Sequence, residues 1–230
     1  SCKGLVTSVE QVFSNAKETS EGSYEGLFDG DYTTFFHTAW GNSEFDVTED
    51  HYLQLDLGEK VQTLVMKYAE RSNAQTPDVP CYVNIFATND ASLLSSAPDG
   101  EDPILVPSEQ WDSLGQFTFT WQYAPLNDEG GAVGVNYSSV NEPVMKGAGL
   151  FSIEMPKAYQ YIRLSVSRNF YEVKNNKHDR VFNGHTYWNL SELRVYKAEY
   201  DPDCVYAHMG PVVIGQLESG LVTAEGEIAA

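Results

Sequence analysis

The sequence predicts an all-β fold, namely an antiparallel jelly-roll β-sandwich with about eight core strands. Two observations predict it: apolar segments of strand length recur along the chain, and segments rich in Gly, Pro, Asn and Asp separate them. Many short strands with long loops favour a sandwich over a fold in which strands alternate with helices. Hydrophobic residues make up 42% of the 230 residues and aromatic residues 13%, which is enough for a substantial core.

The expected strands follow one another from residue 51 to residue 196. In the first, residues 51–57, Leu53, Leu55 and Leu57 alternate with more polar residues and so share one face. Residues 58–60 then favour a turn before the second strand, residues 61–68. The remaining expected strands are residues 82–88, 116–123, 150–154, 161–167 and 193–196, and helix patterning is scarce before the C-terminal segment.

The strand-rich region is predicted to form one domain, residues 1–200, followed by a short C-terminal linker or helix, residues 201–230. Pro202 and Pro211 open this second segment, and residues 212–230 are rich in Ala, Glu, Leu and Val without any aromatic residue. No segment approaches the roughly 18 apolar residues of a membrane-spanning helix. We therefore expect no direct membrane insertion.

The charge of the chain excludes two classes of partner. With 33 acidic and 14 basic residues, the formal net charge is −19. A chain this acidic is not expected to bind nucleic acid by neutralising phosphates, and anionic membrane surfaces would repel it. No Lys or Arg occurs in residues 72–145, whereas basic residues concentrate in residues 146–197. Most of the carboxylates are expected to be solvated, and a few could bind a hard cation.

The three cysteines bear on the compartment. Cys81 begins a strand-like segment and is expected to be a buried free thiol. Cys2 and Cys204 bracket the patterned region, and they could form a disulfide if its ends meet. Alternatively, Ser1 and Cys2 could be the end of a bacterial lipobox, with Cys2 acylated. Either interpretation predicts an extracellular, cell-surface or periplasmic protein, lipid-anchored in the second case.

Four segments, in this order, carry a resemblance to a known superfamily. They are residues 27–38 (LFDGDYTTFFHT), 53–58 (LQLDLG), 161–164 (YIRL) and 188–196 (WNLSELRVY). Together they resemble the discoidin, or coagulation factor 5/8 type C, superfamily of galactose-binding-like domains, and most of all the bacterial family 32 carbohydrate-binding modules. The resemblance implies an eight-stranded jelly roll that binds its ligand through loops at one end and does not catalyse a reaction.

The first of these segments has the chemistry of a calcium site. Asp29, Gly30 and Asp31 offer carboxylate and carbonyl oxygens on a turn, and Thr34 adds a hydroxyl. The resemblance implies a structural calcium ion bound by the side chains of Asp29, Thr34 and Glu192, with carbonyl oxygens of Leu27 and Asp31. The alternative is an Asx-turn without a metal.

The resemblance also implies a sugar site made of an aromatic ring and polar loop residues, because sugars stack their CH faces on rings and pair their hydroxyls with directed polar groups. Each candidate has a structural alternative: Trp40 could belong to the core, Arg71 could pair with nearby carboxylates, and His178 and Arg180 could be solvated. The candidate ligand-binding residues are Trp40, Arg71, Asn73, Arg168, Asn169, His178 and Arg180.

No catalytic motif is found, so the chain is not expected to be an enzyme. We expect a non-catalytic carbohydrate-binding module of a secreted or cell-surface bacterial protein, tethered to further domains of the same chain, whose partner is a glycan or glycoconjugate. One alternative is a protein-adhesion discoidin domain. Another is a jelly-roll glycosidase or lyase, for which Glu109 and Asp112 beside Trp111 would be the carboxylate pair.

Overall fold

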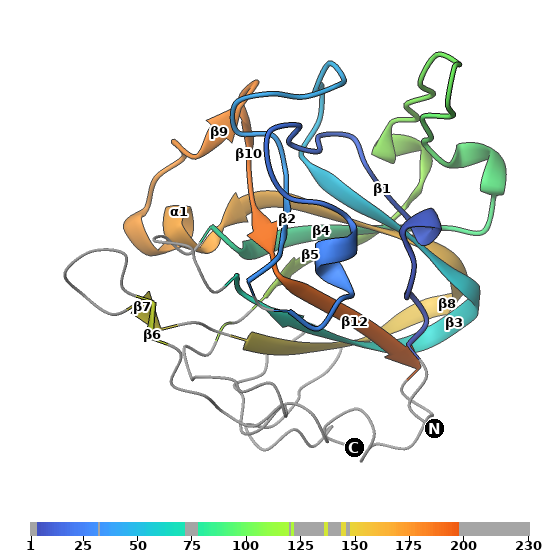
Figure 1. Cartoon of the computed structure of the whole chain (residues 1–230). Helices are drawn as coiled ribbons and strands as arrows, with labels where there is room; N and C mark the ends of the chain where they lie inside the picture. The colour runs from blue at the N-terminus through green and yellow to red at the C-terminus, as the bar shows by residue number, and fades with distance from the viewer. Residues whose placement is uncertain are drawn as a thin grey trace.

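The architecture in the computed structural model, which describes residues 4–31, 33–71, 78–119, 121, 136–137, 144–145 and 148–197, is all-β with very little helix (Figure 1). Its strands are β1 (Val12–Ser14), β2 (Phe36–His37), β3 (Tyr52–Ala69), β4 (Pro80–Thr88), β5 (Asp112–Thr118), β6 (Asn136–Tyr137), β7 (Val144–Met145), β8 (Ala148–Asn169), β9 (Val181–Phe182), β10 (His185–Thr186), β11 (Asn189–Leu190) and β12 (Glu192–Lys197). The helices are η1 (Val9–Gln11), η2 (Glu25–Leu27), η3 (Ala91–Leu93), η4 (Ser108–Gln110) and α1 (Phe170–Asn175).

Two long strands organise the main sheet. Its order is β1-β3-β8-β4-β5, all antiparallel, and β12 pairs with the second half of β3. The first half of β3 lies between β1 and the second half of β8, whereas its second half lies between β12 and the first half of β8. β3 and β8 therefore run through both layers of the sandwich.

The expected turn at residues 58–60 is wrong, because β3 continues through it. The pairing of β3 with β8 shifts register between Asp56 and Val61, and Gly58 has a φ of +77°. Glycine takes this left-handed conformation without strain, so the segment forms a β-bulge that redirects the strand. In the same way, the strands expected at residues 150–154 and 161–167 are parts of one strand, β8.

The core lies between the two layers. Leu53, Leu55 and Leu57 are buried, as their alternation predicts. In the second half of β3, Leu64 and Met66 are buried in the same core. Aromatic residues fill much of the remaining space. Phe117, Phe119, Trp121, Phe151 and Trp188 belong to the same cluster.

A short helix, α1, follows β8, although helix patterning is scarce in this part of the sequence. α1 begins after Asn169, whose side chain accepts the N–H of Glu172, while the Glu172 side chain accepts the N–H of Asn169. This reciprocal capping box stabilises a helix of only six residues. Asn169, a candidate ligand-binding residue in the sequence, is thus the N-cap of this helix.

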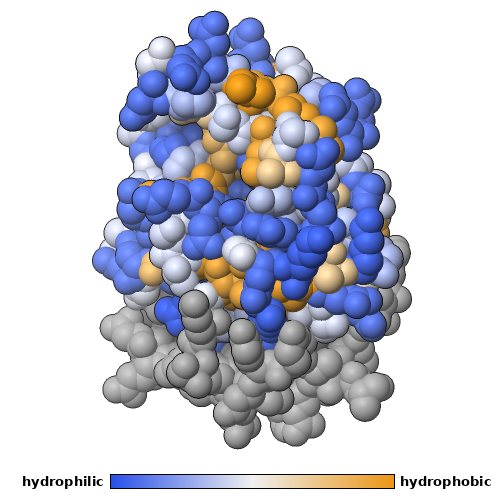
Figure 2. Space-filling model, turned by 90° about the vertical axis from the view of Figure 1, so that its right-hand side faces the viewer, coloured by the Kyte–Doolittle hydropathy of each residue, from blue (hydrophilic) through white to orange (hydrophobic). Residues whose placement is uncertain are grey.

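Several expectations fall outside the described residues, namely those on Cys2, Asn73, Cys204 and the segment 201–230. Cys81 is a buried free thiol, as expected. Within the described part of the chain, no helix is long and apolar enough to cross a membrane. Hydrophilic residues cover most of the face shown in Figure 2, and hydrophobic residues gather in two areas of it. Trp40, Ile104 and Leu105 are the large hydrophobic residues most exposed among those described.

Candidate functional site

The loop after β2 presents Trp40 to solvent, and a buried carboxylate holds it there. Trp40 is 46% exposed, whereas Glu18 is fully buried. The backbone N–H groups of Trp40, Gly41 and Asn42 donate to Glu18 Oε2 over 2.7, 2.9 and 3.1 Å. Burial opposes ionisation of Glu18, but these hydrogen bonds outweigh it and lower its pKa to about 2. Glu18 is therefore charged at neutral pH, and it fixes the loop that carries Trp40.

Arg71 lies beside this loop and is linked to it by a second carboxylate. Glu21 Oε1 accepts the indole N–H of Trp40 over 2.9 Å and lies 3.9 Å from Arg71 Nη1. The guanidinium of Arg71 stacks on Phe35, with 3.9 Å between Cζ and the ring centroid. Arg71 does pair with a carboxylate, as the structural alternative proposed, but Glu21 also ties it to an exposed aromatic ring.

Tyr187 and Arg180 extend the same surface from the C-terminal side. β2 pairs with β11, in the register His37 to Asn189, and this pairing brings the segment before β11 to the loop after β2. The His37 ring lies 5.9 Å from the Tyr187 ring and 6.4 Å from the Trp40 ring. Arg180 Nη1 donates to the Tyr187 hydroxyl over 3.2 Å. We name the set of Glu21, Phe35, His37, Trp40, Arg71, Arg180 and Tyr187 the aromatic–arginine cluster.

The electrostatics of this cluster are set by its two arginines and the neutral His37. Burial is the main cause that lowers the pKa of His37 to about 4, so its ring is uncharged at neutral pH. Arg71 Nε is buried without a hydrogen-bond partner among the described residues. Arg180 stacks on Tyr171 at 4.1 Å and lies 3.6 Å from Asp78. The cluster thus combines the exposed Trp40 ring with guanidinium donors, which suits a ligand with both CH faces and hydroxyl groups.

The other candidate ligand-binding residues have local roles. Asn169 is buried, caps α1 and donates to the carbonyl of Tyr187, so no side-chain atom is free for a ligand. His178 Nδ1 lies 3.1 Å from the buried Glu172 carboxylate. Arg168 Nη1 donates to the carbonyl of Ser167. The structure therefore brings together Trp40, Arg71 and Arg180, but not these three.

Sequence reasoning missed most of the residues that hold the cluster together. Glu18 gives no local signal, because the N–H groups it accepts belong to residues more than twenty positions away. Glu21 bridges Trp40 and Arg71, which follow it by 19 and 50 positions. Tyr187 lies directly before Trp188 of the fourth recognised segment, and its position there was the one available signal.

The residues expected to bind calcium also converge. Asp29 Oδ1 accepts the N–H of Asp31 over 2.9 Å, and the Thr34 hydroxyl donates to the other Asp29 oxygen and to the carbonyl of Asp31. Glu192, at the start of β12, accepts the N–H of Gly30 over 2.6 Å. The two ends of the strand-rich region therefore meet at this loop. Leu27 is buried at the end of η2, close by in sequence.

Glu192 carries the feature that best fits a cation. It is 4% exposed, and its Oε2 has no hydrogen-bond partner among the described residues, although Arg194 Nε lies 3.5 Å away. Burial raises its pKa to about 8, which Arg194 opposes and nearby Asp29 reinforces. No group of three or more His, Cys, Asp or Glu suited to a metal occurs in the described ranges. The oxygens here would be two carboxylates, one hydroxyl and carbonyls, a set typical of calcium.

No protein-family model and no curated protein sequence matches this chain. Solved structures match its fold. The family 32 carbohydrate-binding module of NanJ from C. perfringens, in complex with galactose, is 13% identical, with 81% of this chain and 92% of that chain covered and a TM-score of 0.40. The lectin domain of lectinolysin, complexed with Lewis B antigen, is 11% identical, with 85% and 97% covered and a TM-score of 0.43.

A fucose-binding module from Streptococcus pneumoniae is also 11% identical, with 85% of this chain and 95% of that chain covered and a TM-score of 0.42. All three likenesses are likenesses of fold. The described strands confirm the predicted all-β antiparallel sandwich.

Proposed function

We propose that this chain is a non-catalytic carbohydrate-binding module that binds a glycan or glycoconjugate through the aromatic–arginine cluster. The observation that carries the proposal is the exposed ring of Trp40, fixed by Glu18 beside the guanidinium of Arg71. A ring held at the surface provides a stacking platform for the CH face of a sugar. The adjacent Arg71 and Arg180 provide directed donors for its hydroxyl groups.

The setting we propose follows from the same interpretation. The module belongs to a secreted or cell-surface bacterial protein, acts outside the cytoplasm, and holds glycan near further domains of the same chain. Residues 1–200 are proposed to form the sandwich domain, and residues 201–230 a linker or helix. The net charge of −19 disfavours the two competing surfaces, nucleic acid and anionic membrane.

Glycan binding is tested by an array screen followed by titration calorimetry on the hits. We expect Trp40→Ala and Arg71→Ala each to weaken binding at least tenfold, or by about 1.4 kcal/mol, because each removes one half of the stacking and hydrogen-bonding pair. Ile104→Ala is the matched control, since it removes an exposed apolar side chain from another loop. Variants with unchanged affinity would contradict the proposed site.

Two other outcomes would replace the proposed function. An array without hits, together with binding to a protein ligand that Trp40→Ala weakens, would identify a protein-adhesion domain. Release of reducing sugar from a polysaccharide would identify a glycosidase or lyase. The Glu109→Gln variant would then show whether that carboxylate takes part.

We also propose that Asp29, Thr34 and Glu192, with the carbonyls of Leu27 and Asp31, bind a structural calcium ion. The ion would join the first loop to β12 and bind Glu192 Oε2, which accepts no hydrogen bond from a described residue. Since only the folded state would offer this site, calcium a hundredfold above its dissociation constant would stabilise the fold by about 2.7 kcal/mol.

Removal of calcium is therefore expected to lower the melting temperature by roughly 5–10 °C, and calcium should restore it. Differential scanning calorimetry with and without chelator measures this shift. Asp29→Asn and Glu192→Gln should abolish the response to calcium, whereas Asp99→Asn, an exposed carboxylate in another loop, should keep it. A melting temperature that ignores both chelator and added calcium would refute the site.

A further inference from the structure

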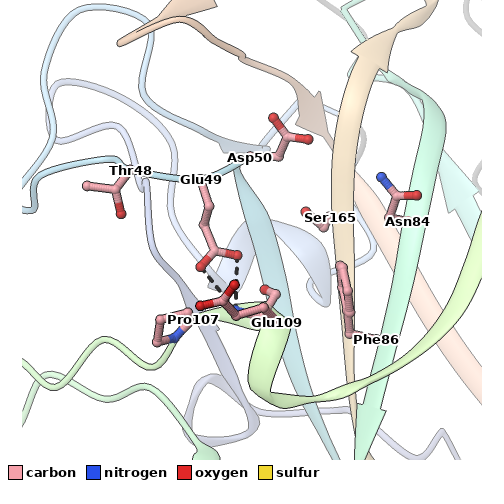
Figure 3. A pocket seen from close by; sticks show the side chains of 9 residues that line it. Thr48, Glu49, Asp50, Asn84, Phe86, Pro107, Glu109 and Ser165 are labelled. Atoms are coloured by element: carbon pink, nitrogen blue, oxygen red, sulfur yellow. Dashed lines mark hydrogen bonds between the residues drawn. The ribbon is translucent and has the colours of Figure 1, made fainter.

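A pocket lies on the outer face of the main sheet (Figure 3). The residues that line it are outside the aromatic–arginine cluster. Its volume is about 470 Å³. β4 and β8 supply one side, the segment before β3 supplies another, and η4 with the residue before it supplies the third. The residues that line it are Thr48, Glu49, Asp50, Asn84, Phe86, Pro107, Ser108, Glu109 and Ser165.

Polar groups in this pocket lack partners of their own. Ser165 is 3% exposed and lines the pocket, yet its hydroxyl has no hydrogen-bond partner among the described residues. Asn84 is the register partner of Ser165 on the neighbouring strand, so both side chains lie on the same face of the sheet. The Asn84 amide also has no partner within the described ranges. Both groups open into the pocket and can pair with the hydroxyl groups of a ligand.

The charged residues that line the pocket are all acidic, although the buried Arg163 donates to Ser108 Oγ beside it. Glu49, Asp50 and Glu109 line it, and none of the nine described lining residues is basic. Glu49 is held in place by the N–H of Ser108, over 3.1 Å to Oε2, and Asp50 Oδ1 lies 2.8 Å from His185 Nδ1. Glu109 is exposed and has no hydrogen bond or ion pair with another described side chain. Three carboxylates in one recess favour a cationic ligand.

The pocket is also partly apolar. Phe86 lies on the outward face of β4, is only half-buried, and forms one side of the pocket, and Pro107 lies opposite in Figure 3. A bare metal ion would use neither the Phe86 ring nor the volume of the recess. A lysine side chain would satisfy a carboxylate but would leave the Ser165 hydroxyl and the Asn84 amide unpaired. A sugar ring with a protonated amino group can pair with the carboxylates, stack on the Phe86 ring and hydrogen-bond with Ser165 and Asn84.

We propose that this pocket is a second ligand site, specific for an amino sugar whose amino group is free and protonated. Glu49, Asp50 and Glu109 would hold the ammonium group, Phe86 would stack on the CH face, and Asn84 and Ser165 would pair with hydroxyls. The site is distinct from the aromatic–arginine cluster, and no residue is common to the two sets.

Isothermal titration of the whole chain with a glucosamine trisaccharide, at a pH where its amino groups are protonated, tests this site. We expect the wild type to bind the glucosamine trisaccharide measurably. The Glu109→Gln and Phe86→Leu variants should each bind it at least tenfold more weakly. The wild type should hardly bind the fully N-acetylated trisaccharide. Glu154→Gln is the charge-matched control, because Glu154 is exposed on the other half of β8. Trp40→Ala should bind the glucosamine trisaccharide as the wild type does.

Several results would overturn the assignment. Absent binding at millimolar ligand, or equal affinity for the acetylated trisaccharide, would refute a site for a free amino sugar. Equal affinity for a lysine tripeptide would show that the pocket selects amines rather than sugars. Loss of glucosamine binding in Trp40→Ala, with Glu109→Gln unaffected, would move that binding to the aromatic–arginine cluster and leave the proposed function standing without the second site.

Discussion

Replacement of Glu18 with alanine is expected to lower the free energy of unfolding by about 3 kcal/mol and to abolish glycan binding. The Glu18 carboxylate accepts three backbone N–H groups and the Asn42 amide, and hydrogen bonds to a charged group contribute about 1.5–3 kcal/mol each. The loop residues are exposed, so water recovers part of that loss. Trp40 would lose the support that fixes its ring beside Arg71.

Urea unfolding followed by circular dichroism measures this effect, with Glu44→Ala as the control for an exposed acidic residue of the same loop. The pH dependence gives a sharper measurement. Because the pKa of Glu18 is lowered to about 2 in the folded state, its contribution is present above the usual value of 4.5 and is lost as pH falls toward 2. The difference in free energy of unfolding between the wild type and Glu18→Gln should therefore shrink as the pH falls from 4.5 toward 2. A constant difference would show that the carboxylate charge does not hold the loop.

Replacement of Arg163 with alanine is expected to be more damaging, at about 4 kcal/mol. Arg163 is fully buried, and its guanidinium lies 4.1 Å from the Tyr52 ring centroid and 4.2 Å from that of Trp111. It donates to Gln54 Oε1, Ser95 Oγ, Ser108 Oγ and the carbonyl of Val106. Alanine would remove these five hydrogen bonds and leave a cavity between two rings.

Arg168→Ala is the matched control for this prediction. Arg168 lies on the same strand, is only partly buried, and makes one side-chain hydrogen bond within the described residues, to the carbonyl of Ser167. We expect its loss to cost less than about 1 kcal/mol. Arg163→Lys should recover little stability, because an ammonium group cannot reach several acceptors and stack on two rings at once. If the Arg163→Ala protein is as stable as Arg168→Ala, the segment that contains Ser95, Val106 and Ser108 does not depend on the Arg163 guanidinium.

Much of the fold was predictable, because apolar alternation is a local property. The alternation of Leu53, Leu55 and Leu57 predicted a strand with one buried face, and the burial of these residues confirms it. The continuity of β3 was not predictable in the same way. Gly58 is compatible with both a turn and a bulge, and only the pairing of the strand with β8 decides between them.

The candidate site was predictable in part, for a related reason. Trp40 and Arg71 stand out as an aromatic and a cationic residue in loops, and the structure places them together through Glu21. The sequence does not show which polar residues will be used internally. Asn169 looks like a ligand contact by residue type, yet it is buried as a helix cap. Conversely, Glu18 looks like one more surface acid among many, yet it is buried.

The passage of β3 and β8 through both layers has a consequence for how this chain folds. Their pairing joins residues far apart in the sequence, such as Tyr52 and Ser165, so a long intervening segment must be closed before either layer can form. High contact order of this kind slows folding. Because both layers contain the same two strands, we expect opening of one layer to disturb the other. Folding and unfolding should therefore be slow and all-or-none, and the domain should resist local opening during its lifetime.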